Sequence, residues 1–325
     1  MVDPGALSAE LPQRNWDGDR GGGGAPRRRP IRGILRGLRP KQWIKNLLIF
    51  AGFVFTMNER WQAFTPAMWE YFERSGLAFI LFSLLASSVY FLNDVIDVEK
   101  DRQHPTKRNR PVASGELSPA LAVAVAVVLM PAALIAGYLL SPSFALVTGG
   151  YAVMQIAYVF LLKKVVLLDV FIIAIGFVIR AVSGAVVIGA AISPWLYTVT
   201  LLGALFLGLC KRRSELLLLD ANAGEHRKIL RSYTTSLLDS LISIVASSTI
   251  MAYSLYTFTS PKLPPHNLMM LTIPFVIFGM FRYLFLAHTQ NAGGSPEEVF
   301  LKDRPLIVTI GLWIVTTAAI LTFRR

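Results

Sequence analysis

The sequence has one cysteine and few charges, and both shortages narrow the kind of protein it can be. The single cysteine, Cys210, rules out an intrachain disulfide, and a lone cysteine at the end of an apolar run is expected to pack as a small hydrophobic side chain. Charged residues make up 16% of the 325 residues, against 54% that are hydrophobic. This balance excludes an ordinary soluble enzyme and predicts an integral membrane protein.

Several familiar site motifs are also missing. The chain has no Walker loop, no glycine pattern of a dinucleotide-binding fold and no Ser-His-Asp arrangement that can be placed from sequence. Its four histidines share no metal-ligand spacing, which argues against a zinc site. Any chemistry must therefore come from other polar clusters.

Residues 1–38 are rich in Gly, Pro and Arg, with a glycine block at 21–24 and an arginine block at 27–29. No apolar core of a signal peptide is present, so we expect no cleavage here. The composition predicts a disordered, basic, cytoplasmic tail, followed by a catalytic membrane domain over residues 39–325.

Apolar runs fill most of the chain after the tail. A membrane span needs about 20 apolar residues, and only the first run is clearly short of that length. The runs lie near 44–57, 75–93, 119–140, 143–162, 167–189, 195–210, 237–259, 268–287 and 305–323. They predict an all-α, polytopic membrane protein with nine transmembrane helices.

The net charge of +12 would suggest a nucleic-acid partner in a soluble chain, but in a membrane protein it first reports topology. Of the 32 Lys and Arg residues, 25 fall in segments that nine spans place on the side of the tail, and five fall on the other side. The distribution predicts a multi-pass plasma-membrane protein, surrounded by the lipid bilayer and without nucleic acid, whose amino terminus is cytoplasmic and whose carboxyl terminus is outside. The long polar loops 94–118 and 211–236 are then cytoplasmic too.

The first of these loops carries three aspartates at one membrane edge. Asp94, Asp97 and Asp101 are spaced i, i+3 and i+7, which on a continuing helix places the three carboxylates on one face, with Asn93 beside them. Like charges this close repel unless a cation neutralises them, and oxygen ligands suit Mg²⁺ that bridges to phosphate. The alternative is a solvated loop whose mixed charges end two helices. The position at a membrane edge favours a metal–diphosphate site.

Four cations follow the aspartates directly and could hold the rest of a polyphosphate. They are Arg102, Lys107, Arg108 and Arg110.

The second loop is also cationic. It opens with Lys211, Arg212, Arg213 and Glu215, and Tyr233 lies near its end. These residues could form a wall for a second anionic group, with Glu215 or Asp220 helping the metal. The alternative is that the charges serve membrane topology alone.

Two further positions place polar side chains where a lipid headgroup or a cavity would lie. Lys45 and Asn46 stand at the entry to the first apolar run, although Lys45 could simply extend toward the membrane surface. Asp169 and Arg180 are 11 residues apart, so they share a helix face, and a buried arginine needs an interior cavity and a partner. A structural ion pair between these two residues is the alternative.

The stretch from Asn93 to Asp101 and the nine apolar runs resemble the UbiA superfamily of intramembrane prenyltransferases, and this resemblance covers everything after about residue 38. It implies nine helices around a central cavity, and a polyprenyl diphosphate held through Mg²⁺ by two aspartate-rich motifs. The second of these motifs is missing here, because Lys211-Arg-Arg-Ser-Glu215 stands in its place. Ordinary prenyl transfer is therefore not expected.

Three longer strings resemble one branch of that family. They are Arg39-Pro-Lys-Gln-Trp-Ile-Lys-Asn46, Asp101-Arg-Gln-His-Pro-Thr-Lys-Arg-Asn-Arg-Pro111 and Lys211-Arg-Arg-Ser-Glu215. Members of the branch move 5-phosphoribose from phosphoribosyl diphosphate to decaprenyl phosphate, for the arabinan of arabinogalactan and lipoarabinomannan in cell walls. The resemblance thus implies a Mg²⁺-dependent pentosyltransferase that acts on these two substrates.

The extra cations suit such a reaction, because a diphosphate, a 5-phosphate and a lipid phosphate repel one another in one cavity. We expect Asn93 and the three aspartates to hold Mg²⁺ on the leaving diphosphate, and Arg110 to stabilise the departing charge. Lys45 is then expected near the lipid headgroup. Residues 211–213 are candidates for the 5-phosphate, although these cationic roles can be exchanged.

Two other functions fit parts of the pattern. An aromatic prenyltransferase of quinone or haem biosynthesis is disfavoured by the missing second acidic motif. A transporter that uses the intramembrane charges would be expected to show an inverted repeat, and none is visible. The sequence leaves open whether the chain forms a homo-oligomer.

Overall fold

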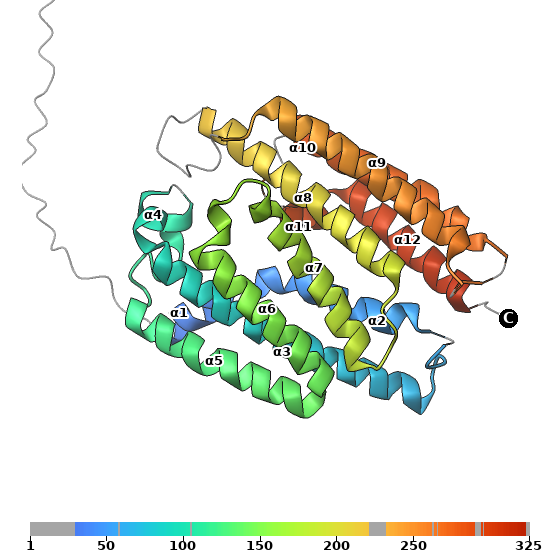
Figure 1. Ribbon diagram of the computed structural model, residues 1–325, viewed down its shortest axis with the longest axis horizontal. Coiled ribbons are helices and arrows are strands. Elements are labelled where there is room, and N and C mark those ends of the chain that lie inside the picture. The colour runs from blue at the N-terminus through green and yellow to red at the C-terminus, as the bar shows by residue number, and fades with distance from the viewer. Residues whose placement is uncertain are drawn as a thin grey trace, which may run out of the picture.

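A computed structural model describes residues 30–57, 59–104, 106–220, 232–261, 263–264, 266–289, 294 and 296–322, without the side chains of 218–220 and 297. The helices are α1 Pro30–Gly37, η1 Pro40–Ile49, α2 Phe50–Phe55, α3 Pro66–Ile96, α4 Val98–Gln103, η2 Lys107–Asn109, α5 Pro119–Leu140, α6 Pro142–Phe160, η3 Leu162–Lys164, α7 Leu168–Val187, α8 Pro194–Asp220, α9 Thr235–Thr259, η5 Leu268–Thr272, α10 Ile273–Thr289, α11 Pro296–Lys302 and α12 Arg304–Thr322. The long helices lie side by side, with α1 and α4 at one end of the bundle and the end of α12 at the other (Figure 1).

Eight helical segments among the described residues are long and apolar enough to cross a membrane. They are α3, α5, α6, α7, α9 and α12, together with Pro194–Leu217 of α8 and the combined η5 and α10 over Leu268–Thr289. The remaining predicted span, 44–57, is built by η1 and α2, which together are shorter than these eight. The chain is therefore an all-α, polytopic membrane protein, and helix length alone does not confirm the predicted count of nine.

The polar residues that begin the spans act as helix caps. Four Ser or Thr side chains accept a hydrogen bond from the backbone N–H three residues on, which satisfies one of the open donors at a helix start. They are Thr65, Ser118, Ser141 and Thr234. A proline follows the first three directly, where its missing N–H costs nothing.

The disordered tail was predicted over residues 1–38, but residues 30–37 form the helix α1. Both arginines of α1, Arg32 and Arg36, pair with Glu116, and these ion pairs hold the helix against the loop before α5. The helix also packs closely, since a Cβ added to Gly37 would lie 2.1 Å from the ring of Phe91. The rest of the predicted tail, residues 1–29, lies outside the described residues.

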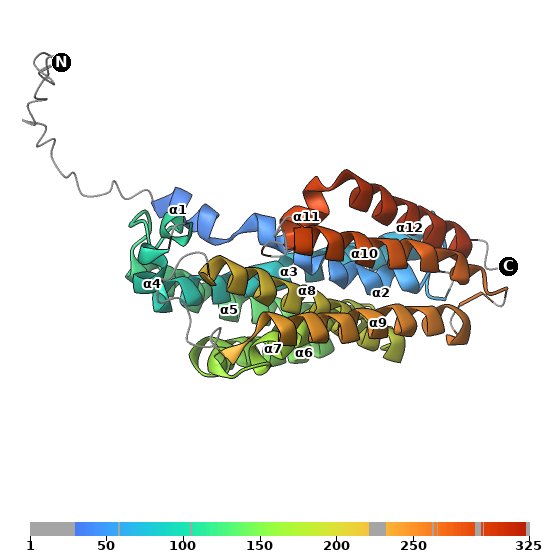
Figure 2. The same cartoon turned by 90° about the horizontal axis from the view of Figure 1, so that it is seen from above.

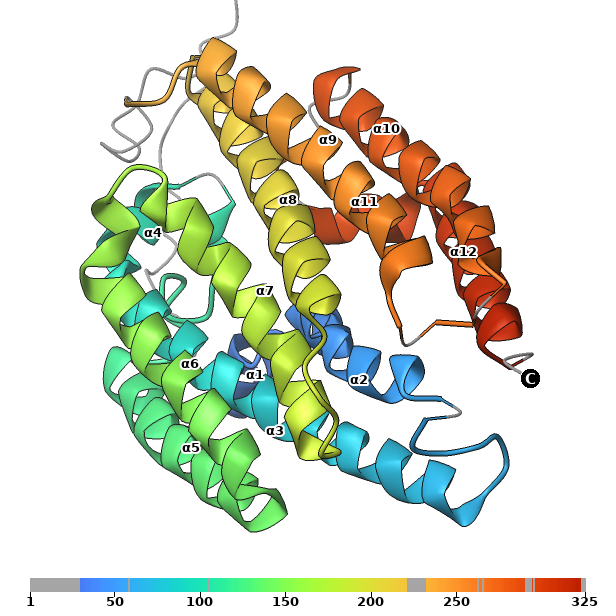
Figure 3. The ribbon, with the colours of Figure 1, turned by 45° about the vertical axis from the view of Figure 1, so that its right-hand side comes forward.

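The bundle has two packed halves that share α7. One core gathers side chains of α3, α5, α6 and the second half of α7, and the other gathers those of α8, α9, α10, α12 and the first half of α7. Figure 2 shows α6 and α7 along one face and α11 and α12 along the opposite face. In Figure 3, α8 and α9 run next to each other beside α7.

The short segment η1–α2 crosses α7 in direct backbone contact. A Cβ added to Gly184 would lie 1.8 Å from the carbonyl oxygen of Ile49, and one added to Gly52 would lie 2.8 Å from the backbone of Gly184. Only glycine permits so close an approach at both positions. The crossing fixes η1 against the last turn of α7.

Candidate active site

The three aspartates of the first loop lie at the end of α3 and on α4. Asp97 occupies a one-residue break between the two helices. Helical hydrogen bonding nevertheless continues across it, because the N–H of Asp97 donates to the carbonyl of Asn93 at 2.9 Å, and the N–H of Asp101 donates to that of Asp97 at 2.9 Å. The predicted helical spacing is therefore kept.

Two of the carboxylates converge on one guanidinium. Nη1 of Arg110 lies 3.2 Å from Oδ1 of Asp94 and 2.6 Å from Oδ2 of Asp101. Both aspartates are buried, whereas the Arg110 side chain is 24% exposed. Arg39 forms a second ion pair with Asp94. The two acids are thus neutralised by arginines that reach them from the solvent side.

The third carboxylate has a different partner, so the prediction that all three gather at one point is not met. Nζ of Lys163, on η3, lies 3.0 Å from Oδ1 of Asp97. Within the described part of the chain, no three His, Cys, Asp or Glu side chains are close enough to hold a metal ion together. The physical reason is charge balance, because a separate cation neutralises Asp97 and removes the need for the carboxylates to share one.

The paired acids have the donor chemistry that a divalent ion requires. Two carboxylate oxygens, from Asp94 and Asp101, already lie within 3.2 Å of a single cationic nitrogen. Hard oxygen ligands of this kind bind Mg²⁺. The donor set therefore fits a divalent metal, with Asn93 and Asp97 as the further predicted ligands.

The loop after α4 holds Arg110 in place. Its backbone N–H donates to the carbonyl of Lys107 at 2.9 Å, its carbonyl accepts from Ser114 at 2.8 Å, and Val112 and Leu117 are buried below it. Of the other predicted cations, Arg102 on α4 pairs with the exposed Glu99 at 2.8 Å, Lys107 is half-buried and Arg108 is exposed.

A second charged cluster joins α7 to α8. Asp169 is buried at the start of α7, and Nε of Arg212 lies 2.7 Å from its Oδ2. Arg212 is itself buried and also pairs with Glu215. The hydroxyl of Tyr233 donates to Oδ1 of Asp169 at 2.8 Å and accepts from the N–H of Leu167 at 2.7 Å.

These contacts engage several residues that the sequence assigned to substrate. Burial raises the pKa of Tyr233 to about 12, so its hydroxyl stays protonated and donates to Asp169. Arg213 pairs with Asp239 on α9, away from Arg212. Of the predicted row 211–213, Lys211 and Arg212 line the cavity described below, and Arg213 does not.

Arg180 is buried in the middle of α7, as the sequence predicted, but its partner is not Asp169. Its Nε donates to Oδ1 of Asn46 at 2.7 Å, its Nη1 to the carbonyl of Gly176 at 2.6 Å and its Nη2 to the hydroxyl of Tyr151 at 3.1 Å. The structural ion pair between Arg180 and Asp169 is therefore wrong. Asn46 is buried, so it faces Arg180 and not the membrane surface.

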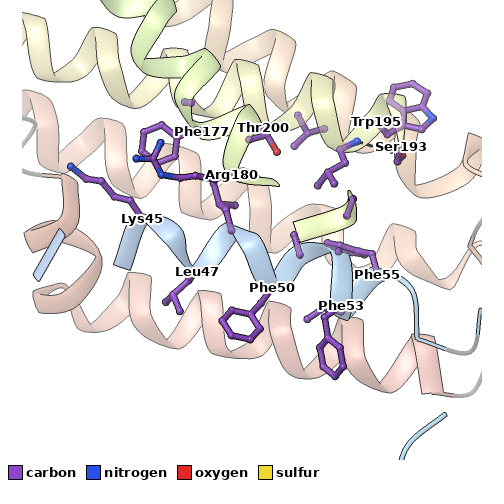
Figure 4. Close-up of a pocket in the computed structure, with 18 of the residues that line it drawn as sticks. Lys45, Leu47, Phe50, Phe53, Phe55, Phe177, Arg180, Ser193, Trp195 and Thr200 are labelled. Carbon is purple, nitrogen blue, oxygen red and sulfur yellow. Dashed lines mark hydrogen bonds between the residues drawn. The ribbon is translucent and has the colours of Figure 1, made fainter. Parts of the chain in front are cut away.

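A large cavity of about 1090 Å³ lies between η1–α2, α7, α8 and α12. One end carries Lys45, Arg180 and Lys211, and Tyr90 of α3 also lines it. Figure 4 shows Lys45 and Arg180 near Phe177 at this end, and Trp195 with Phe53 and Phe55 toward the other. The rest of the lining is mostly aliphatic and aromatic. The shape and lining suit a molecule with an anionic head and an apolar tail.

The acid cluster adjoins the polar end of this cavity. Asp94 stands one helical turn after Tyr90 on α3, and the guanidinium of Arg39 lies 5.0 Å from the centre of the Tyr90 ring while it pairs with Asp94. The aspartates themselves do not line the cavity.

Arg39 was missed by the sequence reasoning as a site residue. It adopts a left-handed backbone conformation, with φ of 52° and ψ of 60°, directly before Pro40. Both features are unfavourable for a non-glycine residue, at a cost of roughly 1–3 kcal/mol, and such strain is concentrated at functional sites. The sequence feature that could have identified Arg39 as a site residue is its position directly before Pro40, where η1 begins.

Comparisons with known proteins show the family and the fold of the chain. Residues 44–211 match the model of the UbiA prenyltransferase family. The chain is 34% identical to a decaprenyl-phosphate phosphoribosyltransferase of Mycobacterium tuberculosis, over 90% of this chain and 95% of that protein, and 35% identical to one of Mycolicibacterium smegmatis, over 92% and 95%. A UbiA homolog of Archaeoglobus fulgidus bound to GPP and Mg²⁺ has the same fold, with a TM-score of 0.68, 17% identity, and coverage of 89% of this chain and 99% of that one.

Proposed function

The chain belongs to the UbiA prenyltransferase family, and on that premise we propose that it transfers 5-phosphoribose from phosphoribosyl diphosphate to decaprenyl phosphate. The product is decaprenylphosphoryl-5-phosphoribose, a precursor for cell-wall arabinan. The enzyme is thus a pentosyltransferase on a prenyltransferase fold.

One observation carries the proposal. Asp94 and Asp101 form a buried pair of carboxylates, and Asp94 lies one helical turn after Tyr90, which lines a cavity that has cations at one end and apolar side chains along the rest. The acids suit a metal-bound diphosphate, and the cavity suits a lipid phosphate. Both reactants are then brought to the same end of the bundle.

Asp94 and Asp101 would hold a magnesium ion, with Asn93 as a further ligand, and Asp97 would join them only on leaving Lys163. A bound Mg²⁺ supplies charge neutralisation to a leaving diphosphate. Arg110 and Arg39, which neutralise the acids in this structure, are then free to bind phosphate oxygens. Lys107 and Arg108 add positive charge around the donor.

The transfer exchanges one bond at the anomeric carbon for another. The bond to the diphosphate oxygen breaks, and the electron pair leaves with the diphosphate. A lipid phosphate oxygen forms the new bond from the opposite face. The acceptor phosphate is already ionised near pH 7, since its second pKa is about 6, so no side chain has to remove a proton.

The lipid tail can leave the cavity sideways. Leu47 and Val54 on η1–α2 and Ile314 on α12 line the cavity and are also exposed on the outer surface. The cavity wall is therefore open to the bilayer between these two elements. We place the acid cluster on the cytoplasmic side of the plasma membrane, because most Lys and Arg residues fall there.

The proposal is tested with purified protein in lipid nanodiscs, decaprenyl phosphate and phosphoribosyl diphosphate labelled in the ribose. We expect a labelled lipid whose mass matches decaprenylphosphoryl-5-phosphoribose, and its loss in Asp97→Ala. Glu99→Gln is the matched control, since Glu99 is an exposed acid two residues after Asp97, in the first turn of α4. Transfer of a prenyl group to 4-hydroxybenzoate, without labelled lipid, would instead identify an aromatic prenyltransferase.

A further inference from the structure

Arg180 carries a buried positive charge that no described side chain balances. It is 5% exposed, and its three hydrogen-bond partners are an amide oxygen, a backbone carbonyl and a phenol. A guanidinium has five N–H donors, and the described residues accept from three of them. Three aromatic rings, of Phe82, Tyr151 and Phe177, lie within 5.4 Å of its centre and offset part of the cost of burial.

The acid that could have balanced this charge is already engaged. Asp169 lies on the same helix, but it pairs with Arg212 and accepts from Tyr233. A charged side chain inside a membrane span is costly unless it is paired or faces a polar cavity. Arg180 lines the large cavity, so an anion in that cavity can complete its coordination.

The surroundings hold the guanidinium ready for such an anion. The amide nitrogen of Asn46 donates to the hydroxyl of Ser83 at 2.8 Å, which turns the amide oxygen toward Arg180. The glycine crossing at Gly184 fixes η1 beside this part of α7. A cation fixed in advance in this way loses little freedom when its ligand binds.

We infer that Arg180, with Lys45 beside it, binds the phosphate of the acceptor lipid, whereas the acid cluster receives the donor. The neighbouring wall is aromatic and aliphatic, so the anion bound here belongs to an amphiphile with an apolar chain. This inference rests on the proposed function and assigns one of its two substrates to a specific subsite.

Arg212 and Arg213 are accordingly excluded from this role. Each already pairs with one or more carboxylates, Arg212 with Asp169 and Glu215 and Arg213 with Asp239. Arg212 lines the cavity as well, but its guanidinium is held by these two carboxylates, whereas Arg180 has no acidic partner among the described residues.

Direct binding of decaprenyl phosphate, measured in nanodiscs without donor, tests the assignment. We expect Arg180→Gln to weaken binding roughly 10- to 100-fold, the range for loss of a charged hydrogen bond. Asn46→Asp should also weaken it, because a carboxylate of the same shape would pair with Arg180 in place of the phosphate. Decaprenol, which lacks the phosphate, should bind both variants as it binds the unaltered protein.

Two measurements separate this role from a structural one. Magnesium diphosphate binding should stay within about twofold in both variants, and Asn46→Asp should raise the melting temperature of the ligand-free protein by supplying the missing counter-charge. The matched control is Arg282→Gln, since Arg282 is another intramembrane arginine but already pairs with Asp303 at 2.8 Å and does not line the cavity. It should leave lipid binding unchanged.

Unweakened decaprenyl phosphate binding in Asn46→Asp, or loss of diphosphate binding in place of lipid binding, would overturn the inference and leave the proposed function standing. The inference would also be overturned if phosphatidic acid or inorganic phosphate competed with decaprenyl phosphate as well as decaprenyl phosphate itself does, because the site would then bind any phosphate. Failure of the unaltered protein to form labelled lipid from both substrates is a different result, which rejects the proposed function itself.

Discussion

The acid cluster at the end of α3 and the cluster between α7 and α8 are built from the same parts but differ in access to water. In each cluster, buried carboxylates form ion pairs with arginines. In the first, the Arg39 and Arg110 side chains are 21% and 24% exposed, whereas in the second the Arg212 side chain is 4% exposed. Partly exposed arginines can exchange a carboxylate for a phosphate, but a buried one cannot without leaving its partner unpaired. The first cluster is suited to ligand exchange and the second to holding two helices together.

The largest effect is expected when a carboxylate is removed from the acid cluster at the end of α3, which we describe as suited to ligand exchange. Asp101→Asn should lower kcat/KM for labelled lipid formation roughly 10⁴-fold, since a metal site contributes several kcal/mol to a transition state that separates charge. The melting temperature of the ligand-free protein should change little, because Arg110 keeps Asp94 as a partner. A large fall in melting temperature with activity retained would reverse the roles of the two clusters.

The buried cluster should respond in the opposite way. Arg212→Ala should destabilise the fold by about 3–5 kcal/mol, because Asp169 would be left as a buried charge without its arginine. Unfolding in detergent is the measurement. The double variant Arg212→Met with Asp169→Leu should recover much of that loss, since replacing a whole buried pair by apolar groups is often neutral. If Arg212→Ala weakened donor binding at unchanged stability, Arg212 would instead be a substrate ligand.

The smallest effect is expected at the rim of the acid cluster. Arg108 is exposed, so Arg108→Ala should raise the KM for phosphoribosyl diphosphate by about two- to fivefold at low salt, which corresponds to 1 kcal/mol or less. The difference should disappear at high ionic strength, because screening removes long-range attraction. A salt-independent loss would show that Arg108 contacts the bound donor directly.

Hydrophobic runs and charge asymmetry were enough to predict the membrane fold, because span length and polar loops follow from the cost of burying polar backbone and charge in lipid. The eight long spans lie where the runs were drawn. Sequence spacing also predicted correctly that Asp169 and Arg180 are both buried.

Spacing could not predict which partner each charge would choose. Asp169 and Arg180 share a helix, yet one binds Arg212 from α8 and the other Asn46 from η1. Lys163 and Asp97 are likewise far apart in sequence. Such pairings depend on how helices cross, and the crossing depends on close contacts such as the one at Gly184 that no periodicity reveals.

The winding of η1 lengthens an apolar run that is short for a membrane span. A 3₁₀ coil rises about 2.0 Å per residue and an α-helix about 1.5 Å. Pro40–Ile49 and Phe50–Phe55 laid end to end reach about 29 Å, of which the apolar residues 44–55 supply about 21 Å, against a hydrocarbon thickness of about 30 Å. The 3₁₀ winding of residues 44–49 thus adds about 3 Å, which is the rise of about two α-helical residues. An insertion that let η1 become an α-helix would keep the length of the segment but point the side chains of Lys45 and Asn46 in other directions. The 3₁₀ winding therefore couples the length of this segment across the membrane to the direction of its polar side chains.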